Sequence, residues 1–305
     1  MLIFILKRVV VFFMALTSLF SSFSDKEFAD SCEQYDFPRI AAKAQKPGTL
    51  RIMSYNIRCG DVNGVEVRDR IGISVRQIKE VMPDSLGIQE ATPEWMKALN
   101  RELPLYDWVG VERENGSSPL KAGESCPIFY LKDRFELIDS GNFWVSETPD
   151  TPSFGPGAAC KRICTWAKLK DRRTGDVFVH VNTHYDHVSE EARVQGALIV
   201  TRFIKEHFAA LPIVFTADMN TTNEGEAYAT MTRDLADARF TAADVLTYGT
   251  FHAGKDPALK ADYYIDFVLL SDAFEAAAYR TVTKGVDGRF TSDHFPIYAD
   301  LKFKN

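Results

Sequence analysis

Short apolar segments that each end in a polar residue recur along the chain, and this pattern limits the fold more than any other feature. Residues 50–56 alternate side chains as a strand with one buried face does. Residues 85–89 form a short apolar run that ends at Glu90, and residues 213–215 form another that is soon followed by Asp218. Polar groups delivered by several strand ends to one rigid edge are the arrangement expected of a binding or catalytic site.

Helices are interspersed with these strands without strict alternation. Apolar residues recur at helical spacing over residues 68–82, and Thr92 followed by Pro93 predicts the start of a second helix that ends at Leu103. A third, amphipathic helix is predicted over residues 189–207. Further strands are predicted at 128–131, 135–138, 163–169, 177–183, 265–270 and 297–303, and a long exposed loop at 146–157. This order indicates an α+β layered sandwich that forms one catalytic domain over residues 49–305.

The first residues form a separate compositional unit. Lys7 and Arg8 precede an apolar run over residues 9–20, and small residues follow at Ser22 and Ser24. This order predicts a signal peptide over residues 1–24, with an uncleaved anchor as the alternative. The chain is therefore expected to be exported to the periplasm or the extracellular space, with no stable membrane span in its mature form. Residues 25–48 are polar and are interpreted as a leader arm.

The charge balance and the cysteines narrow the function. The chain has 305 residues and a formal net charge of −6. A tight nucleic-acid binder usually carries a basic patch, so the acidity argues against one, although it leaves open a hydrolase that must release its product. The five cysteines are odd in number and scattered, so they form no disulfide framework and are interpreted as buried small residues or at most one disulfide.

Eight polar residues lie at or near the strand ends, and their types indicate a reaction class. Carboxylate and amide oxygens are hard ligands that suit Mg²⁺ or Mn²⁺ better than zinc, and histidines transfer protons near neutral pH. A cation with an acid and a base makes a hydrolytic phosphoryl site. The eight residues are Asn56, Glu90, His184, Asp218, Asn220, Asp266, Asp293 and His294.

Taken singly, each of these residues has an ordinary structural interpretation. Asn56 could form a turn, and His184 could be a satisfied core histidine. Asp266 is the strongest alone, because a buried carboxylate is costly unless it is paired. For several further residues, the sequence does not decide between a role in the site and a structural role. They are Asp186, His187, Arg162, Arg193, Phe143, Trp144 and Trp166.

Six ordered motifs resemble the endonuclease/exonuclease/phosphatase superfamily. They are Ser-Tyr-Asn-Ile-Arg at 54–58, Leu-Gly-Ile-Gln-Glu at 86–90, Asn-Thr-His at 182–184, Thr-Ala-Asp-Met-Asn at 216–220, Tyr-Ile-Asp at 264–266 and Ser-Asp-His at 292–294. The resemblance covers residues 49–303, and further segments are similar to a bacterial exported branch. It implies a four-layer α/β/β/α sandwich of the DNase I-like kind. One departure is Thr-Ala before Asp218, where many members have glycine.

The resemblance also implies a role for each site residue. Glu90 would be the principal metal ligand, helped by Asn56 and Asp293, with Mg²⁺ or Mn²⁺ as the ion. His294 would be the general base, oriented by Asp266.

The remaining roles concern the phosphate. His184 would bind the phosphate or protonate the leaving oxygen, and Asp218 and Asn220 would position the nucleophile and a phosphoryl oxygen. The roles of His294 and Asp218 are interchangeable at this level.

The substrate is left open among several phosphoesters. The first hypothesis is a metal-dependent phosphodiesterase that acts as a monomer on nucleic acid or on a small phosphodiester. Alternatives within the same chemistry are a phospholipid or sphingomyelin phosphodiesterase and a sugar-phosphate phosphatase. A hypothesis of another class is a non-catalytic binding module on the same fold, against which the intact Glu90, Asp293 and His294 argue.

Overall fold

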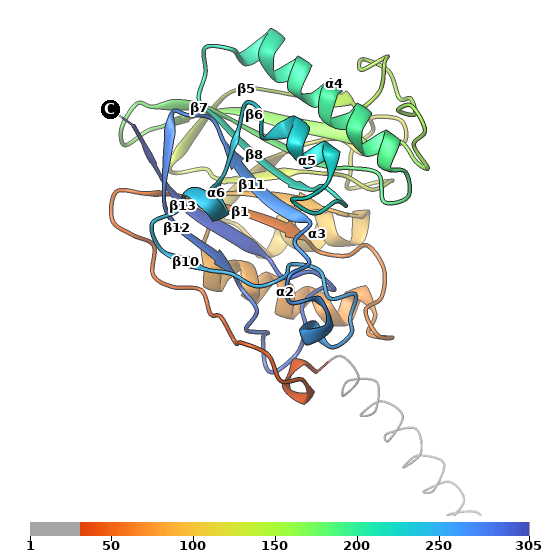
Figure 1. The fold of residues 1–305 in the computed structure, drawn as a ribbon, viewed down its shortest axis with the longest axis vertical. Coiled ribbons are helices and arrows are strands. Elements are labelled where there is room, and N and C mark those ends of the chain that lie inside the picture. The colour runs from red at the N-terminus through yellow and green to blue at the C-terminus, as the bar shows by residue number, and fades with distance from the viewer. Residues whose placement is uncertain (1–30, 305) are drawn as a thin grey trace, which may run out of the picture.

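The structure is a computed structural model, and it describes residues 31–304 of the chain (Figure 1). The predicted signal peptide, residues 1–24, lies outside the described residues. Two β-sheets form the centre, and four of the helices cover their outer faces: α2 (Val67–Val81), α3 (Pro93–Glu102), α4 (Glu190–Phe208) and α5 (Glu226–Met231). Shorter turns of helix are η1 (Cys32–Gln34), α6 (Ala238–Thr241) and η2 (Pro257–Lys260).

The first sheet has seven strands and is mixed. Its spatial order is β10 (Val245–Leu246), β12 (Phe274–Thr281), β13 (Ile297–Phe303), β1 (Leu50–Asn56), β2 (Ser85–Gln89), β4 (Ile128–Leu131) and β3 (Tyr106–Val109). The central strand β1 runs parallel to β2 and antiparallel to β13, where Leu50 is opposite Leu301. The sheet is therefore closed at its centre by the first and the last strand of the domain.

The second sheet has six strands. Its order is β5 (Phe135–Trp144), β6 (Ile163–Asp171), β7 (Val177–His184), β8 (Ile213–Asp218), β11 (Asp266–Leu270) and β9 (Ala236–Asp237). Strands β7 and β8 are parallel because α4 connects them, and β11 is antiparallel to β8. Every strand predicted from the sequence is present, whereas β3, β9, β10 and β12 were not predicted.

Three apolar cores separate the four layers. Ile52, Phe178 and Val214 belong to the core between the sheets. A second core joins α2 and α3 to the outer face of the seven-stranded sheet, and a third joins α4 and α5 to the outer face of the six-stranded sheet. The predicted four-layer α/β/β/α sandwich is confirmed.

The alternation of side chains along each strand explains where the polar residues go. In β8, Ile213, Phe215 and Ala217 belong to the core under α4. Val214 belongs to the core between the sheets, so period-two alternation directs Thr216 and Asp218 into the same layer. The layer between the sheets thus changes from apolar to polar along its length.

Hydrogen bonds satisfy the polar part of this layer. His180 bonds with Ser85 Oγ at 2.8 Å and Thr216 Oγ1 at 2.9 Å, and Asn182 Oδ1 accepts from Gln89 Nε2 at 2.7 Å. Gly87 leaves room for this network, because a Cβ there would lie 2.1 Å from Thr216 Oγ1. These bonds tie the two sheets together directly below the strand ends.

The segment before β1, interpreted from the sequence as a leader arm, packs on the domain from residue 31 onward. Phe37 forms a small core with Cys32, Phe290 and Phe295. The Ile40 amide donates to Thr283 Oγ1 at 2.7 Å. The arm therefore supports the loop that leads to β13.

Two further properties concern the described residues as a whole. None of their helices is both long enough and apolar enough to cross a bilayer. All five cysteines lie among them, and each is a free thiol.

Candidate active site

Three predicted site residues stand side by side in the six-stranded sheet. His184 at the end of β7 is opposite Asp218 at the end of β8, and Asp218 is opposite Asp266 at the start of β11. Asn56, at the end of β1 in the other sheet, donates from Nδ2 to Asp218 Oδ2 at 2.8 Å. The ends of both sheets therefore meet at Asp218.

His294 approaches the same carboxylate from the loop before β13. Its Nδ1 lies 2.9 Å from Asp266 Oδ2, and its Nε2 lies 3.7 Å from Asp218 Oδ2. Burial disfavours the charged ring, but the two carboxylates outweigh it and raise the pKa of His294 to about 10. Burial also raises the pKa of Asp218 to about 7, against the attraction of His294. The ring therefore holds a proton beside a carboxylate that titrates near neutrality.

His184 has a different environment. Its Nε2 lies 2.8 Å from Asn220 Nδ2, which also donates to the Tyr185 carbonyl at 3.0 Å. Because Asn220 Nδ2 can only donate, Nε2 accepts and Nδ1 carries the proton of the neutral ring. Burial and the charge of Arg162 hold the pKa of His184 well below its usual range. His184 Nδ1 is buried without a partner in the protein, and the residue lines the pocket described below.

Glu90 and Asp293 lie on either side of one cation. Arg58 Nη1 is 3.8 Å from Glu90 Oε2, and Arg58 Nε is 3.7 Å from Asp293 Oδ2. Burial raises the pKa of Glu90, but the neighbouring His184 and hydrogen bonds from Cys59 and Asn56 lower it more, so the carboxylate stays ionised. Both carboxylates supply the hard oxygen donors that a divalent cation such as Mg²⁺ or Mn²⁺ prefers, and the Arg58 side chain between them is 43% exposed rather than locked in the interior.

Asn56 has another role in the structure besides the predicted one. Its Nδ2 donates to Glu90 Oε1 at 2.9 Å, and its Oδ1 accepts from the Arg58 amide at 2.9 Å. The side chain therefore orients Glu90 and Asp218, and metal ligation by Asn56 stays a prediction. A second group of possible ligands, Asp218, Asp266 and His294, has one donor atom from each residue within 4.8 Å of the others.

Three site residues have a left-handed backbone. The φ angles of Arg58, Glu90 and Asn220 are 60°, 64° and 49°. Residues other than glycine rarely adopt this backbone conformation, so surrounding contacts must impose it. It turns Glu90 out of the strand pattern of β2 and directs it toward Asn56.

These residues open into a pocket of about 540 Å³. Glu90, His184, Asp218, Asn220 and His294 line it. The walls include several residues that the sequence did not identify as part of a site, namely Arg58, Cys59, Arg113, Glu124, Cys160, Phe251 and Tyr263. Most of them lie in loops without regular periodicity, so only their place in the fold brings them to the pocket.

Four residues whose roles the sequence did not decide either line the pocket or support its wall. Arg162, Arg193 and His187 line the pocket. The buried Asp186 carboxylate accepts from the amides of Ala159, Val188 and Ser189 at 2.9 to 3.0 Å, so it orders the start of α4.

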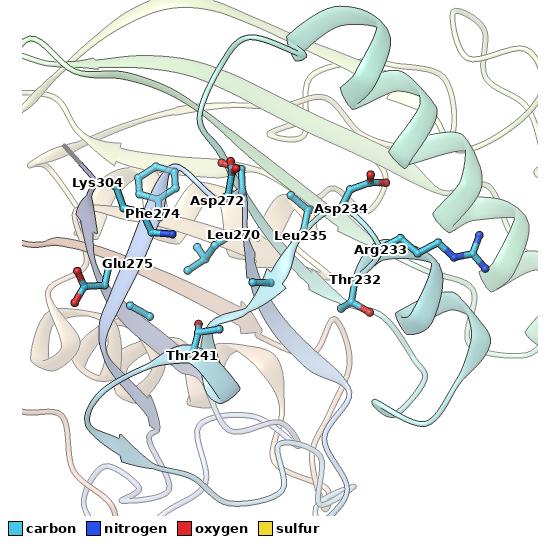
Figure 2. A pocket seen from close by; sticks show the side chains of 13 residues that line it. Thr232, Arg233, Asp234, Leu235, Thr241, Leu270, Asp272, Phe274, Glu275 and Lys304 are labelled. Atoms are coloured by element: carbon cyan, nitrogen blue, oxygen red, sulfur yellow. The ribbon is translucent and has the colours of Figure 1, made fainter.

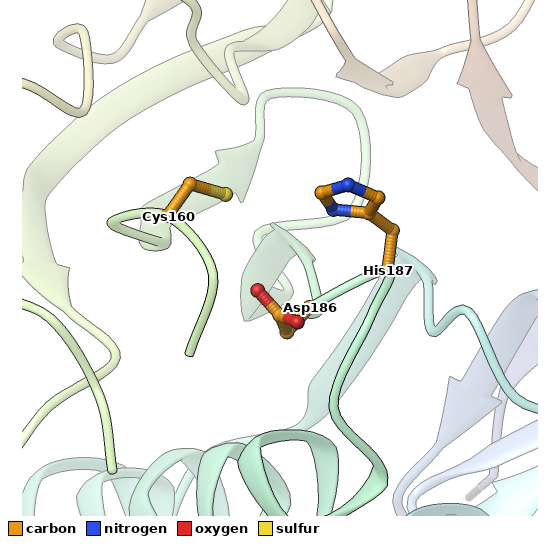
Figure 3. Close-up of side chains that lie close together, drawn as sticks. All are labelled: Cys160, Asp186 and His187. Atoms are coloured by element: carbon orange, nitrogen blue, oxygen red, sulfur yellow. The ribbon is translucent and has the colours of Figure 1, made fainter. Parts of the chain in front are cut away.

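Cys160, Asp186 and His187 come close enough to suggest a metal site (Figure 3). Arg162 argues against that interpretation, because its Nη2 lies 2.9 Å from His187 Nδ1 and its Nε lies 3.8 Å from Asp186 Oδ2. A guanidinium between two of the three groups disfavours a second cation. The group therefore holds Arg162 in the pocket wall.

A separate hollow of about 430 Å³ lies away from this chemistry (Figure 2). Leu270, Asp272 and Phe274 line it at the turn between β11 and β12. Asp266 begins β11 and Leu270 ends it, so the hollow is at the opposite end of the strand from the site. Its charges come from Arg233, Asp234, Asp272, Glu275 and Lys304, without the paired histidines of the active-site pocket.

Comparisons with known proteins place this arrangement among solved structures. A protein from Bacteroides thetaiotaomicron described as of the endonuclease/exonuclease/phosphatase family is 32% identical, with a TM-score of 0.79, and the match covers 85% of this chain and 100% of that one. An endonuclease/exonuclease/phosphatase from Bacteroides vulgatus is 38% identical, with a TM-score of 0.77, over 84% and 99%. A mannosyl-6-phosphatase from Bacteroides thetaiotaomicron is 32% identical, with a TM-score of 0.78, over 83% and 100%. No protein-family model and no curated protein matches the chain.

Proposed function

From the membership of this chain in the endonuclease/exonuclease/phosphatase family, which makes it a phosphoester hydrolase, we propose that it removes phosphate from a small phosphomonoester with the help of a divalent metal ion. The observation that carries this proposal is one pocket. It joins an ionised Glu90, a carboxylate flanked by two histidines, and a wall that contains Arg58, Arg162 and Arg193.

The arginines favour a phosphomonoester over a phosphodiester. A monoester phosphate carries about −1.5 to −2 charges near pH 7, which is more than a diester carries. Arg58, Arg162 and Arg193 all line the pocket, and guanidinium groups match phosphate oxygens well. A volume of about 540 Å³ suits a small molecule. The similarity to a mannosyl-6-phosphatase, at 32% identity, also favours a phosphomonoester.

The metal would be held by Glu90 and Asp293, with Asn56 beside them. When bound, a divalent cation polarises the phosphoryl group and stabilises the negative charge that develops on it. The identity of the ion, Mg²⁺ or Mn²⁺, is part of the proposal, and the hard oxygen donors support it.

The other residues would manage protons and position. A water oxygen attacks phosphorus and gives its proton to the Asp218 carboxylate, while the bond to the leaving oxygen breaks and that oxygen takes a proton from solvent. His294 keeps its own proton, because Asp266 lies 2.9 Å from Nδ1, and it supplies positive charge beside the reacting group. His184 donates from Nδ1 to a phosphoryl oxygen. This assignment chooses Asp218 as the base from the two residues that the sequence left interchangeable.

The test compares p-nitrophenyl phosphate, bis-p-nitrophenyl phosphate and mannose 6-phosphate as substrates. Phosphate release is followed with Mg²⁺, with Mn²⁺ and with EDTA. We expect metal-dependent hydrolysis of both monoesters, lost in EDTA and in Glu90→Gln. Cleavage of the diester alone would restore the phosphodiesterase hypothesis.

Two other outcomes have distinct meanings. Full activity in EDTA would contradict the metal-assisted mechanism. A folded protein that binds phosphate but hydrolyses none of the three esters would support the binding-module hypothesis.

Export and a monomeric state are separate proposals. The order of charge, apolar run and small residues in residues 1–24 supports a cleaved signal. N-terminal sequencing of the mature chain, with light scattering of the same sample, tests both. A chain that still begins at Met1 would contradict cleavage after Ser24.

A further inference from the structure

The loop between β3 and β4 is folded around a buried carboxylate. Glu112 is fully buried, and its Oε1 accepts from the amides of Asn115 and Ser117 at 3.0 Å each. Its Oε2 accepts from the Glu114 amide at 2.6 Å. Gly123 packs against the same group, since a Cβ there would lie 2.2 Å from Glu112 Oε2. Residues 110–126 therefore form a rigid loop rather than a loose connection.

This loop presents one ion pair to the active-site pocket. The Arg113 guanidinium pairs with the Glu124 carboxylate, and the Arg113 amide donates to the Glu124 carbonyl at 2.9 Å. The Arg113 carbonyl also accepts from Trp144 Nε1 at 2.6 Å. The two side chains are only 19% and 17% exposed, and both line the pocket. Their positions are thus fixed before any ligand enters.

The pair stands next to the reacting centre without belonging to it. A Glu124 oxygen, a Glu90 oxygen and Cys59 Sγ all lie within 4.8 Å of one another. Glu90 is the proposed metal ligand, so Glu124 is within reach of the alcohol portion of a phosphate ester held there. A carboxylate in that position repels a second phosphate, as in a nucleic-acid strand, and accepts hydrogen bonds from neutral hydroxyl groups.

We infer that Arg113 and Glu124 bind neighbouring hydroxyl groups of the leaving alcohol, which makes the substrate class the phosphate esters of polyols such as sugars. The inference rests on the proposed function and adds the residues that select the alcohol. A carboxylate accepts from two hydroxyls, and a guanidinium donates to hydroxyl oxygens in a fixed plane. A site built to bond hydroxyls rejects alcohols that lack them, because its buried polar groups are then left unpaired.

The experiment compares two monoesters that differ in hydroxyl groups. The wild type, Glu124→Gln and Arg113→Lys are assayed with mannose 6-phosphate and with p-nitrophenyl phosphate, which has no hydroxyl on its leaving group. We expect Glu124→Gln to lower kcat/KM for the sugar phosphate by about 10- to 100-fold, mainly through KM. Hydrolysis of p-nitrophenyl phosphate should stay within about twofold, as one expects when the lost contact is to the alcohol alone.

Controls separate this inference from its rivals. Glu147→Gln, an exposed glutamate in the loop over residues 146–157, should change neither substrate. Equal losses on both esters with a higher Mg²⁺ requirement would make Glu124 a metal ligand and overturn the inference. No change on either ester would also overturn it.

Failure of the proposed function has a different signature. In that case the wild type hydrolyses neither monoester, and the inference falls with it. If Glu124→Gln does not fold, Arg113→Lys decides, since it keeps the charge and loses the planar fork. Loss on the sugar phosphate alone supports the inference, and any other result contradicts it.

Discussion

The two sides of the active site use the same residue type at the same burial to opposite effect. His294 and His184 are 4% and 5% exposed, and both lie close to Asp218. His294 has Asp266 at Nδ1 and a pKa raised to about 10, whereas His184 Nδ1 has no partner and the pKa lies well below its usual range. Burial lowers the pKa of both rings; the carboxylates beside His294 outweigh it, whereas the charge of Arg162 adds to it at His184.

The site therefore has a charged side, at His294, and a neutral side, at His184. In the proposed mechanism, the His294 side places positive charge where negative charge develops. The His184 side offers a donor that neither gains nor loses a proton near neutral pH. The following substitutions test the division, beginning with the largest expected effect.

Removing the charged side should cost most of the activity. We expect His294→Ala to lower kcat by about 10³-fold, since a positioned catalytic group contributes about 10² to 10⁴. The measurement is phosphate release from p-nitrophenyl phosphate at saturating substrate. His207→Ala, an exposed histidine on α4, serves as the control. A loss below tenfold would show that His294 is outside the reaction.

Weakening the charged side should change the pH profile as well as the rate. In Asp266→Asn the largest charge that raises the His294 pKa is gone, so the ring loses its proton at lower pH. Wild-type activity should be lost as pH falls through about 7, when Asp218 gains a proton, and as pH rises through about 10, when His294 loses one. The variant should be about 10²-fold slower, with its alkaline limb at lower pH.

The control for that profile lies just past the other end of the same strand. Asp272→Asn changes an exposed carboxylate just beyond the far end of β11 and should leave the profile intact. An unchanged alkaline limb in Asp266→Asn would contradict the role of Asp266.

Two substitutions separate the contributions of the two ring nitrogens of His184 on the neutral side. In His184→Asn the side-chain amide stands near the Nδ1 position and keeps a donor for phosphate. In His184→Gln the amide oxygen stands near the Nε2 position and keeps the contact to Asn220. We expect Gln to lower kcat/KM by about tenfold and Asn by less, as loss of one donor predicts. The reverse order would mean that the contact to Asn220 matters more than the donor.

The smallest effect concerns stability and continues along β7. His180, four residues before His184 in the same layer, is fully buried, and desolvation lowers its pKa to about 3. The unfolded chain binds a proton there below about pH 6.5, so the free energy of unfolding falls as pH decreases from 6.5 toward 3, by up to about 1.4 kcal/mol per pH unit. His180→Gln should be less stable at pH 7 and should lose less on acidification. Urea unfolding at pH 7 and pH 5 measures both, and an equal slope in the variant would contradict the assignment.

Much of the fold could be predicted because local pattern and tertiary position agree. Residues 50–56 and 85–89 match β1 and β2, and the helix predicted over residues 189–207 matches α4 within a residue at each end. Strand β12 was missed, because its sequence, Phe-Glu-Ala-Ala-Ala-Tyr-Arg-Thr, is rich in a helix former. Pairing with β10 and β13 imposes the extended form there, and no short window contains that information.

The candidate site, too, could be predicted only in part. His184, Asp218, Asp266 and Asn56 are adjacent to strands, so alternation and sheet pairing bring them together. The pocket wall comes from loops that have no periodicity. Glu124 is an example, because its position depends on the fold of residues 110–126 around Glu112 rather than on its immediate neighbours.

The pairing of β1 with β13 determines how late in synthesis the first sheet can form. Leu50 bonds across to a strand that ends at Phe303, and β13 lies between β1 and β12 inside the sheet. Residues up to the end of β13 must leave the ribosome before that sheet can close, and Asp293 and His294 emerge only just before this closing strand. A nascent or prematurely ended chain therefore has a central strand with one open edge and no assembled site, which makes it inactive and prone to aggregate.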